Sequence, residues 1–239
     1  MKEIVYPYGS SHLIGEKTRE KLLANKIDKI EIPSSKDATQ ATTLIQFSGG
    51  IDSTFVLWWW LLNHPDEYCV VHHIDMMHFE KRNKEELDAV DRVLRWLDSQ
   101  GLKNYFYLQN PFDYGNIPGV VYDVEVCGFL AGIILYSERF KSISKVFFPI
   151  YGHETTREQI RKEVMHLTAK RKVECIYPLV GLSKTDVMKM MPYELLKLCW
   201  YCRVPLDGKA CGNCHTCEQV LKGEPEVIEE NLKNYLKDF

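Results

Sequence analysis

Residues 43–54 read TLIQFSGGIDST, and this stretch decides the fold of the chain. A short apolar run leads into the adjacent glycines Gly49 and Gly50, and a second apolar segment follows them. Two glycines permit a sharp backbone turn with positive φ, and they let a ligand approach the main chain without meeting a Cβ atom. A helix that begins just after such a turn presents free N–H groups and a partial positive charge. The stretch therefore predicts a strand, a phosphate-binding loop and a helix in succession.

The side chains of this loop suit a nucleotide phosphate. The hydroxyls of Ser48, Ser53 and Thr54 can donate hydrogen bonds to phosphate oxygens, and Asp52 suits a Mg²⁺ ion or the cap of the helix. The loop lacks the lysine of a Walker A motif and the spacing of a dinucleotide-binding loop. The predicted nucleotide-binding residues of the loop are Phe47, Ser48, Gly49, Gly50, Ile51, Asp52, Ser53 and Thr54.

Beyond this stretch, short apolar runs alternate with longer segments of helical spacing. The predicted strands are Thr43–Phe47, Cys69–Ile74, Tyr105–Leu108, Val146–Ile150 and Glu174–Tyr177. The predicted helices are Thr54–Asn63, Lys81–Gln100, Tyr122–Phe140 and Thr156–Arg171. This alternation predicts an α/β fold with a doubly wound, mainly parallel, Rossmann-like sheet. Asp75 ends the second predicted strand, at the sheet edge where ligands of such folds collect, and is added to the predicted nucleotide site.

Five of the eight cysteines lie between Cys199 and Cys217. Four of them have the spacing C-x8-C-x2-C-x2-C, which suits tetrahedral Zn²⁺ in a small loop that has few apolar residues of its own. The predicted zinc ligands are Cys202, Cys211, Cys214 and Cys217. Cys199 forms an alternative C-x2-C pair with Cys202, and an iron–sulfur cluster is the rival to zinc. Cysteines crowded in this way predict a metal site in a reducing compartment rather than a disulfide framework.

The composition excludes several classes of protein. The chain has 239 residues, of which 45% are hydrophobic, and this composition predicts a globular protein. Its net charge of −3 predicts no broad electrostatic attraction for nucleic acid. No signal peptide and no apolar run long enough to span a bilayer is visible, and we expect a cytoplasmic protein without a membrane partner. The predicted segments are a 1–40 extension, a 41–197 nucleotide-binding domain, a 198–222 zinc segment and a 223–239 helix.

The loop SGGIDST resembles the SGGxDS signature of the PP-loop ATP pyrophosphatases. Together with the four cysteines and the segment Pro178–Lys184, it resembles the 7-cyano-7-deazaguanine synthase (QueC) family over roughly Thr43–Leu221. The resemblance implies an ATP-dependent ligase that adenylates 7-carboxy-7-deazaguanine, couples ammonia to give the amide, and continues to the nitrile. It also implies that Lys184 neutralises charge on the phosphates. The predicted catalytic residues are Ser48, Asp52, Ser53 and Lys184.

The chain departs from this family in three segments. Residues 75–79 read DMMHF instead of a YGQRH-like run, Tyr122-Asp123 replaces an Arg-Asn pair, and residues 152–156 read GHETT instead of YPDCR. The last two segments lie where a deazaguanine would be held, so the resemblance carries over for ATP and not for the acceptor. The predicted acceptor-binding residues are Tyr122, Asp123 and Glu154.

Other functions remain open from the sequence. The predicted partners are a deazapurine and ammonia, nucleic acid is not required, and a homodimer is expected. One alternative is a PP-loop enzyme that transfers sulfur to tRNA, with Cys199 or Cys202 as the persulfide carrier. Another is a QueC-like enzyme that acts on a different acceptor, and a third is a binding module without activity. The intact loop argues against that module.

Overall fold

The computed structural model describes residues 38–113, 115, 117, 123–151 and 155–237. Of the predicted 1–40 extension, only the short 3-10 helix η1 (Ala38–Gln40) belongs to these ranges. Tyr122 and Glu154, two of the predicted acceptor-binding residues, lie outside them.

Within the described ranges, the strands form one parallel sheet in the order β3-β2-β1-β4-β5. The strands are β1 (Thr43–Gln46), β2 (Cys69–Met77), β3 (Tyr105–Asp113), β4 (Lys145–Phe147) and β5 (Glu174–Ile176). The predicted α/β fold with a parallel sheet is therefore confirmed. The strand β2 continues to Met77 and β3 to Asp113, further than their apolar runs predicted, because the two strands pair with each other over their whole length.

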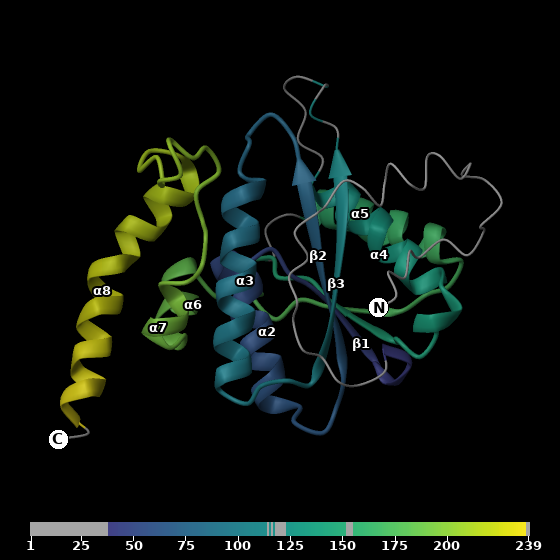
Figure 1. Ribbon diagram of the computed structural model, residues 1–239, viewed down its shortest axis with the longest axis horizontal. Helices are drawn as coiled ribbons and strands as arrows, with labels where there is room; N and C mark the ends of the chain where they lie inside the picture. The colour runs from purple at the N-terminus through teal and green to yellow at the C-terminus, as the bar shows by residue number, and fades with distance from the viewer. Residues whose placement is uncertain (1–37, 114, 116, 118–122, 152–154, 238–239) are drawn as a thin grey trace, which may run out of the picture. The chain divides into compact units, whose positions relative to one another are not determined.

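Helices cover both faces of this sheet. The helices are α2 (Ile51–Asn63), α3 (Asn83–Ser99), α4 (Asp123–Tyr136), η2 (Glu138–Phe140), α5 (Thr155–Ala169), α6 (Lys184–Met190), α7 (Tyr193–Leu196) and α8 (His215–Lys237). Figure 1 shows α2 and α3 on one face of the sheet and α4 and α5 on the other. None of the helices in the described ranges is both long and apolar enough to cross a membrane.

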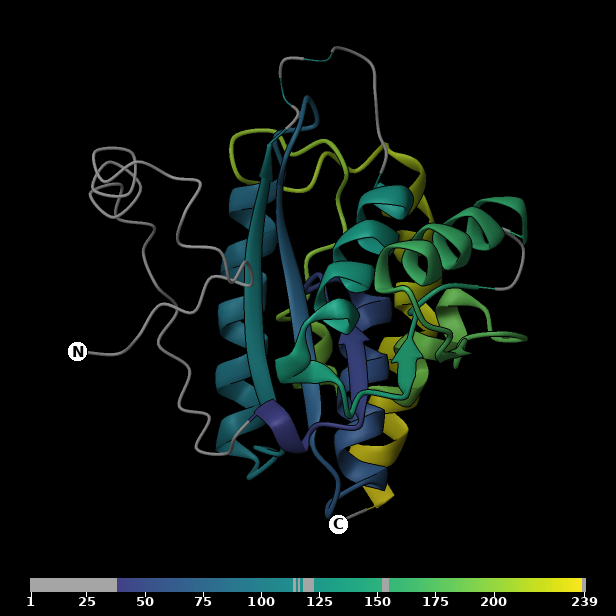
Figure 2. The same ribbon diagram turned by 90° about the vertical axis from the view of Figure 1, so that its right-hand side faces the viewer.

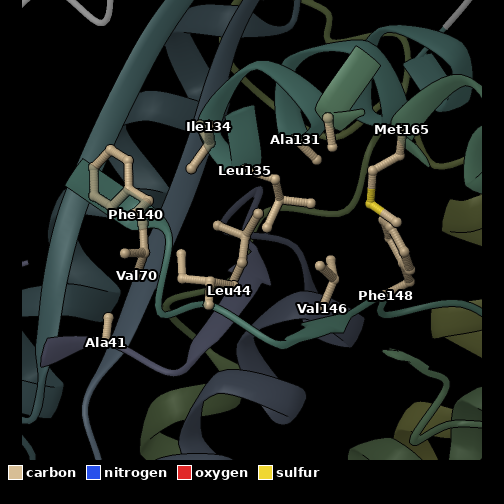
Figure 3. Packing of buried hydrophobic residues seen from close by; sticks show 12 residues of the cluster. Ala41, Leu44, Val70, Ala131, Ile134, Leu135, Phe140, Val146, Phe148 and Met165 are labelled. Atoms are coloured by element: carbon tan, nitrogen blue, oxygen red, sulfur yellow. The ribbon is translucent and has the colours of Figure 1, made fainter. Parts of the chain in front are cut away.

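The core beneath α4 and α5 joins the central strands to these two helices (Figure 3). Leu44 of β1, Val70 of β2 and Val146 of β4 pack there with Leu135 of α4 and Met165 of α5. All of them are buried. Burying a side chain of this size stabilises the fold by about 1.5–3 kcal/mol, so this layer fixes the positions of the strand ends above it.

Two glycines bring α4 and α5 unusually close together. A Cβ atom on Gly128 would lie 2.6 Å from the Arg161 carbonyl oxygen, and one on Gly132 would lie 2.5 Å from the Thr168 Cβ. The spacing of four residues places both glycines on one face of α4. The backbone of α5 therefore packs directly against α4, and this contact sets the position of Arg161.

The strand order places a ligand crevice beside β1. The chain goes from β1 to β2 on one side, whereas β4 lies on the other side of β1. Parallel sheets of this kind bind ligands at the carboxyl ends of the strands where the order reverses. Figure 2 shows β1 (purple) and β4 (green) pointing toward the same end of the sheet. The loops after β1 and β4 therefore meet at one site.

The C-terminal helix begins earlier than its apolar pattern predicted. The prediction placed its start at residue 223, whereas α8 begins at His215. Cys217 therefore lies in the first turn of α8, and the last two cysteines of the predicted zinc segment mark a helix start.

Candidate active site

The loop after β1 fits tightly against α3. Gly49 has a φ of 73°, which favours glycine. A Cβ atom at this position would lie 2.9 Å from the backbone nitrogen of Val90 and 3.1 Å from the carbonyl oxygen of Glu86. Both the backbone angle and the contact with α3 therefore require glycine at this turn.

The hydroxyls of Ser48 and Ser53 hold the loop in shape. The Ser48 backbone N–H donates to Ser53 Oγ at 3.1 Å, and the Gly50 N–H donates to Ser48 Oγ at 3.3 Å. The two Oγ atoms are 3.1 Å apart, and Ser53 Oγ donates to the Gly50 carbonyl at 3.2 Å. Gly50 is the N-cap of α2 and provides no side-chain cap, so the helix start offers N–H groups to a phosphate.

Asp52 and Lys184 meet at the rim of this loop. Lys184 Nζ lies 2.6 Å and 2.7 Å from the two carboxylate oxygens of Asp52, although 132 residues separate them in the sequence. Lys184 is the first residue of α6, where Ser183 and Asp186 form a capping box. The structure thus brings together two residues that were predicted separately.

Tyr151 is a third member of this group, and its place after β4 is the one feature of the sequence that points to it. Its hydroxyl donates to Asp52 Oδ1 at 2.5 Å, and Lys184 Nζ lies 5.6 Å from the centre of its ring. Burial and the neighbouring Asp52 carboxylate raise the pKa of Tyr151 far above its usual range. Tyr151 therefore stays protonated and acts as a hydrogen-bond donor.

A cavity of about 240 Å³ opens beside the loop. Its polar lining includes Ser48 and Ser53. Its apolar lining includes Ile74 and Met76 of β2 and Ile150, which follows β4. Its remaining lining residues are Gln46, Phe47, Arg82, Glu86, Asp123, Cys127, Pro149, Arg161 and Arg203. The cavity lies at the crevice that the strand order predicts.

Asp75 does not line this cavity, and its role in the nucleotide site stays a prediction. The prediction ended the strand at Ile74, but β2 runs on to Met77, and neighbouring residues of a strand point to opposite faces. Ile74 and Met76 face the cavity, whereas Asp75 accepts a hydrogen bond from Asn83 of α3 at 3.3 Å. Burial raises the pKa of the Asp75 carboxyl.

Asp123 lines the cavity but already has two arginine partners. Arg82 Nη2 lies 2.5 Å and Arg203 Nη2 3.4 Å from Asp123 Oδ2. Burial alone would raise the pKa of Asp123, but the two guanidinium groups outweigh it and lower that pKa. Both arginines contact the same oxygen, Oδ2, and the role of Asp123 in binding the acceptor stays a prediction.

The four predicted metal ligands come together in one cluster. The sulfur atoms of Cys202, Cys211, Cys214 and Cys217 all lie within 4.8 Å of one another. The sulfurs of Cys211 and Cys217 are 3.9 Å apart. Four thiolates bound to one Zn²⁺ at about 2.3 Å define a tetrahedron with edges of about 3.8 Å. The donor set and its spacing fit a single zinc ion.

A tight turn brings the first two of these cysteines together. Leu206 and Lys209 exchange two backbone hydrogen bonds of 2.9 Å around Asp207 and Gly208, whose φ values of 49° and 74° are those of a type I′ turn. The chain returns so that the Cys211 N–H donates to Cys202 Sγ at 3.2 Å.

Hydrogen bonds favour the thiolate form of Cys214, whereas burial raises the pKa of Cys217 to about 12. Burial acts to raise the pKa of Cys214, but backbone N–H groups at Arg203 and Cys217 outweigh it, and the pKa falls to about 6.

The cysteine segment is fastened to the phosphate loop. The Trp200 N–H donates to the Gly49 carbonyl at 3.0 Å, and the Trp200 indole N–H donates to the Cys202 carbonyl at 2.8 Å. Arg203, next to the ligand Cys202, pairs with Glu80 at 3.0 Å and reaches the cavity. Figure 1 shows this segment at the end of the molecule where the strands terminate. The cluster can therefore position one wall of the cavity.

Cys199 stands apart from the four ligands. Its thiol donates to the Leu195 carbonyl at 3.5 Å, and burial raises its pKa to about 12. A buried thiol with so high a pKa is a poor nucleophile.

No protein-family model matches the sequence, and no curated protein matches it either. Among solved structures, the chain is similar to the U34-tRNA thiolase NcsA from Methanococcus maripaludis with its 4Fe–4S cluster. The identity is 15%, the TM-score 0.44, and the match covers 85% of this chain and 74% of that one. It is also similar to the Leishmania major tyrosyl-tRNA synthetase in complex with tyrosinol, at 12% identity and a TM-score of 0.28. That match covers 68% of this chain and 36% of the synthetase chain.

Proposed function

We propose that this chain is a PP-loop, QueC-like ligase that uses ATP to activate a carboxylate and couples ammonia to it. The acceptor would be 7-carboxy-7-deazaguanine or a close relative, and the product its amide, with the nitrile as a further step. The observation that carries the proposal is the loop Ser48–Thr54. It combines the SGGxDS pattern with a phosphate-binding geometry, and it opens onto a cavity at the carboxyl ends of the strands.

ATP would bind with its phosphates on this loop. The N–H groups at the start of α2 and the hydroxyls of Ser48 and Ser53 are the donors, and Lys184 stands at the rim to neutralise charge on the leaving pyrophosphate. Mg²⁺ in such sites is held mostly by phosphates and water, so Asp52 as a single carboxylate suffices. Its binding to Mg²⁺ would release Lys184 toward the phosphates.

The reaction would occur in two steps. One carboxylate oxygen of the acceptor attacks the α-phosphorus of ATP, and the bond from that phosphorus to the bridging oxygen breaks, with its electron pair leaving on pyrophosphate. Ammonia then attacks the acyl carbon, the bond from that carbon to the bridging oxygen breaks with its electron pair leaving on AMP, and the nitrogen loses a proton. The cavity beside Ser48 and Ser53 gives the carboxylate a place next to the α-phosphate.

Zinc at the cysteine cluster would be structural. Four protein thiolates leave no open position for a substrate, which is the mark of a structural zinc site. The short sulfur–sulfur separations support a single ion over an iron–sulfur cluster, because a cluster core would hold its four thiolates further apart.

Sulfur transfer to tRNA is the alternative function. It requires an accessible, reactive thiol near the nucleotide, for which the sequence predicts Cys199 or Cys202. Burial and a raised pKa argue against Cys199 in this role, and Cys202 lies in the cysteine cluster. A brown protein that contains iron would favour the alternative, and stoichiometric zinc without visible absorption favours the ligase.

The test is product analysis by mass spectrometry. The protein is incubated with ATP, Mg²⁺, ammonium and 7-carboxy-7-deazaguanine, and we expect the amide or nitrile together with AMP and pyrophosphate. A reaction without ammonium and one with Ser48→Ala protein are the controls. Formation of ADP and phosphate, or an unchanged acceptor in the presence of bound ATP, would contradict the proposed function.

A further inference from the structure

Three arginines line the cavity next to the phosphate loop, and they differ in their surroundings. Arg82 precedes α3, Arg203 follows the first cysteine of the cluster, and Arg161 lies near the middle of α5. An anionic acceptor would meet all three, so their existing partners decide which of them can bind it.

Arg82 and Arg203 are already neutralised by carboxylates. Arg82 binds Asp123 at 2.5 Å and lies 3.2 Å from Glu86. Arg203 binds Glu80 through two nitrogens, each 3.1 Å from the same carboxylate oxygen. Charge-assisted pairs of this kind are strong, so a ligand anion would compete with carboxylates at either arginine.

Arg161 is different. The residue is 5% exposed, and its guanidinium carbon lies 4.9 Å from the centre of the Phe148 ring. Its Nε forms an ion pair with Glu158 Oε2 at 3.5 Å that is not a hydrogen bond, and among the described residues this buried Nε has no hydrogen-bond partner. A buried charged donor with unmade hydrogen bonds is costly, and a ligand that accepts them relieves this cost.

We propose that Arg161 binds the carboxylate of the acceptor and presents it to the phosphate loop; this inference rests on the proposed function. Guanidinium binds carboxylate through two parallel hydrogen bonds, which fixes orientation as well as position. Ser48 and Ser53 line the same cavity, so a carboxylate on Arg161 faces the loop that would hold the α-phosphate. One oxygen then forms the bond to phosphorus while pyrophosphate leaves with the electron pair of the broken bond.

The test is isothermal titration calorimetry of 7-carboxy-7-deazaguanine into protein saturated with α,β-methylene-ATP and Mg²⁺. Arg161→Met should weaken acceptor binding roughly 10- to 100-fold and leave the affinity for the ATP analogue within twofold. Arg161→Lys keeps the charge but loses the planar guanidinium group, so it should weaken acceptor binding less. If Arg161→Met does not fold, the acceptor affinity of Arg161→Lys tests the proposal. Arg95→Met, on the exposed face of α3, is the matched control and should bind both ligands normally.

A ligand without the carboxylate isolates the contact. 7-Deazaguanine should bind the wild-type protein and the Arg161 variants with equal affinity. If both variants bind the carboxylate as the wild-type protein does, or if they lose the ATP analogue instead, the inference about Arg161 is wrong while the proposed function stands. If the wild-type protein binds no carboxylate at all, the proposed acceptor fails and this inference fails with it.

Discussion

Single residues at the loop have two tasks. Ser48 and Ser53 stabilise the turn through their own hydrogen bonds, and the same hydroxyls line the cavity where phosphates and acceptor would meet. Asp52, Lys184 and Tyr151 form a compact group at the rim. Each of these side chains is held in place by another, which is how a site keeps the geometry that a reaction needs.

The first prediction concerns Ser48. Ser48→Ala removes one phosphate donor and one acceptor within the loop, so the affinity for ATP with Mg²⁺ should fall roughly 10- to 100-fold. The circular dichroism spectrum should stay unchanged, because a surface turn carries little of the core. Calorimetry measures the affinity, with Ser99→Ala at the exposed end of α3 as the control. If Ser48→Ala and the wild-type protein bind ATP with equal affinity, the loop does not bind the nucleotide phosphates.

At the scale of elements, polar side chains join the three neighbouring strands below the cavity. His72 of β2 meets Gln46 of β1 at 3.2 Å through Nδ1 and Asn110 of β3 at 3.0 Å through Nε2. Burial lowers the pKa of His72 to about 3, so the ring stays neutral in the folded protein. His72 is thus a buried core histidine with a partner at each ring nitrogen.

The second prediction is the effect of pH through His72. The unfolded chain binds a proton at His72 below pH 6.5 and the folded chain does not, so the stabilising contribution is complete above pH 6.5 and decreases as the pH falls. The free energy of unfolding should therefore fall between pH 7.5 and pH 5.5, and in His72→Gln that fall should be smaller by about 1.4 kcal/mol. Urea unfolding at the two pH values measures it. A fall of the same size in both proteins would mean that His72 titrates alike in the folded and unfolded states.

The third prediction concerns the contact between α4 and α5. Alanine usually stabilises a helix relative to glycine, by about 1 kcal/mol. At Gly132 the added Cβ would lie 2.7 Å from the Met165 carbonyl oxygen, which cannot move without its helix. Gly132→Ala should thus destabilise the protein by about 1–3 kcal/mol, as measured by urea unfolding. An increase in stability would show that the two helices can separate freely.

At the scale of the whole molecule, the cysteine cluster links the C-terminal segment to the phosphate loop. Trp200 binds the loop, Cys202 belongs to the cluster, and Arg203 reaches the cavity. Few apolar residues lie between Cys202 and Cys217, so a bound ion would supply most of the local folding free energy.

The fourth prediction is therefore about metal content. Cys211→Ser should yield protein that is poor in zinc and weak in nucleotide binding, because the segment that touches Gly49 loses its anchor. Cys199→Ser should retain one zinc per chain, since its thiol lies outside the cluster. Inductively coupled plasma mass spectrometry measures the metal. If Cys199→Ser loses its zinc and Cys202→Ser keeps it, then Cys199 and not Cys202 is the first zinc ligand.

The sequence predicted the strands, the loop and the cysteine cluster because each depends on neighbouring residues. Alternating apolar runs define the sheet, and the spacing of glycines and cysteines defines the two motifs. Contacts between distant segments were not predictable in this way, such as Arg203 with Glu80 or Tyr151 with Asp52. The end of β2 was predicted too early because the strand continues past its apolar run, and strand alternation turns the Asp75 side chain away from the cavity.

The most direct test of the central claim, activation of a carboxylate by adenylation, is oxygen transfer. The acceptor 7-carboxy-7-deazaguanine is labelled with ¹⁸O in both carboxylate oxygens and incubated with the protein, ATP, Mg²⁺ and ammonium. The account predicts AMP that carries one ¹⁸O atom, unlabelled pyrophosphate, and an amide that keeps the other label. Unlabelled AMP, or label found in inorganic phosphate, would contradict it.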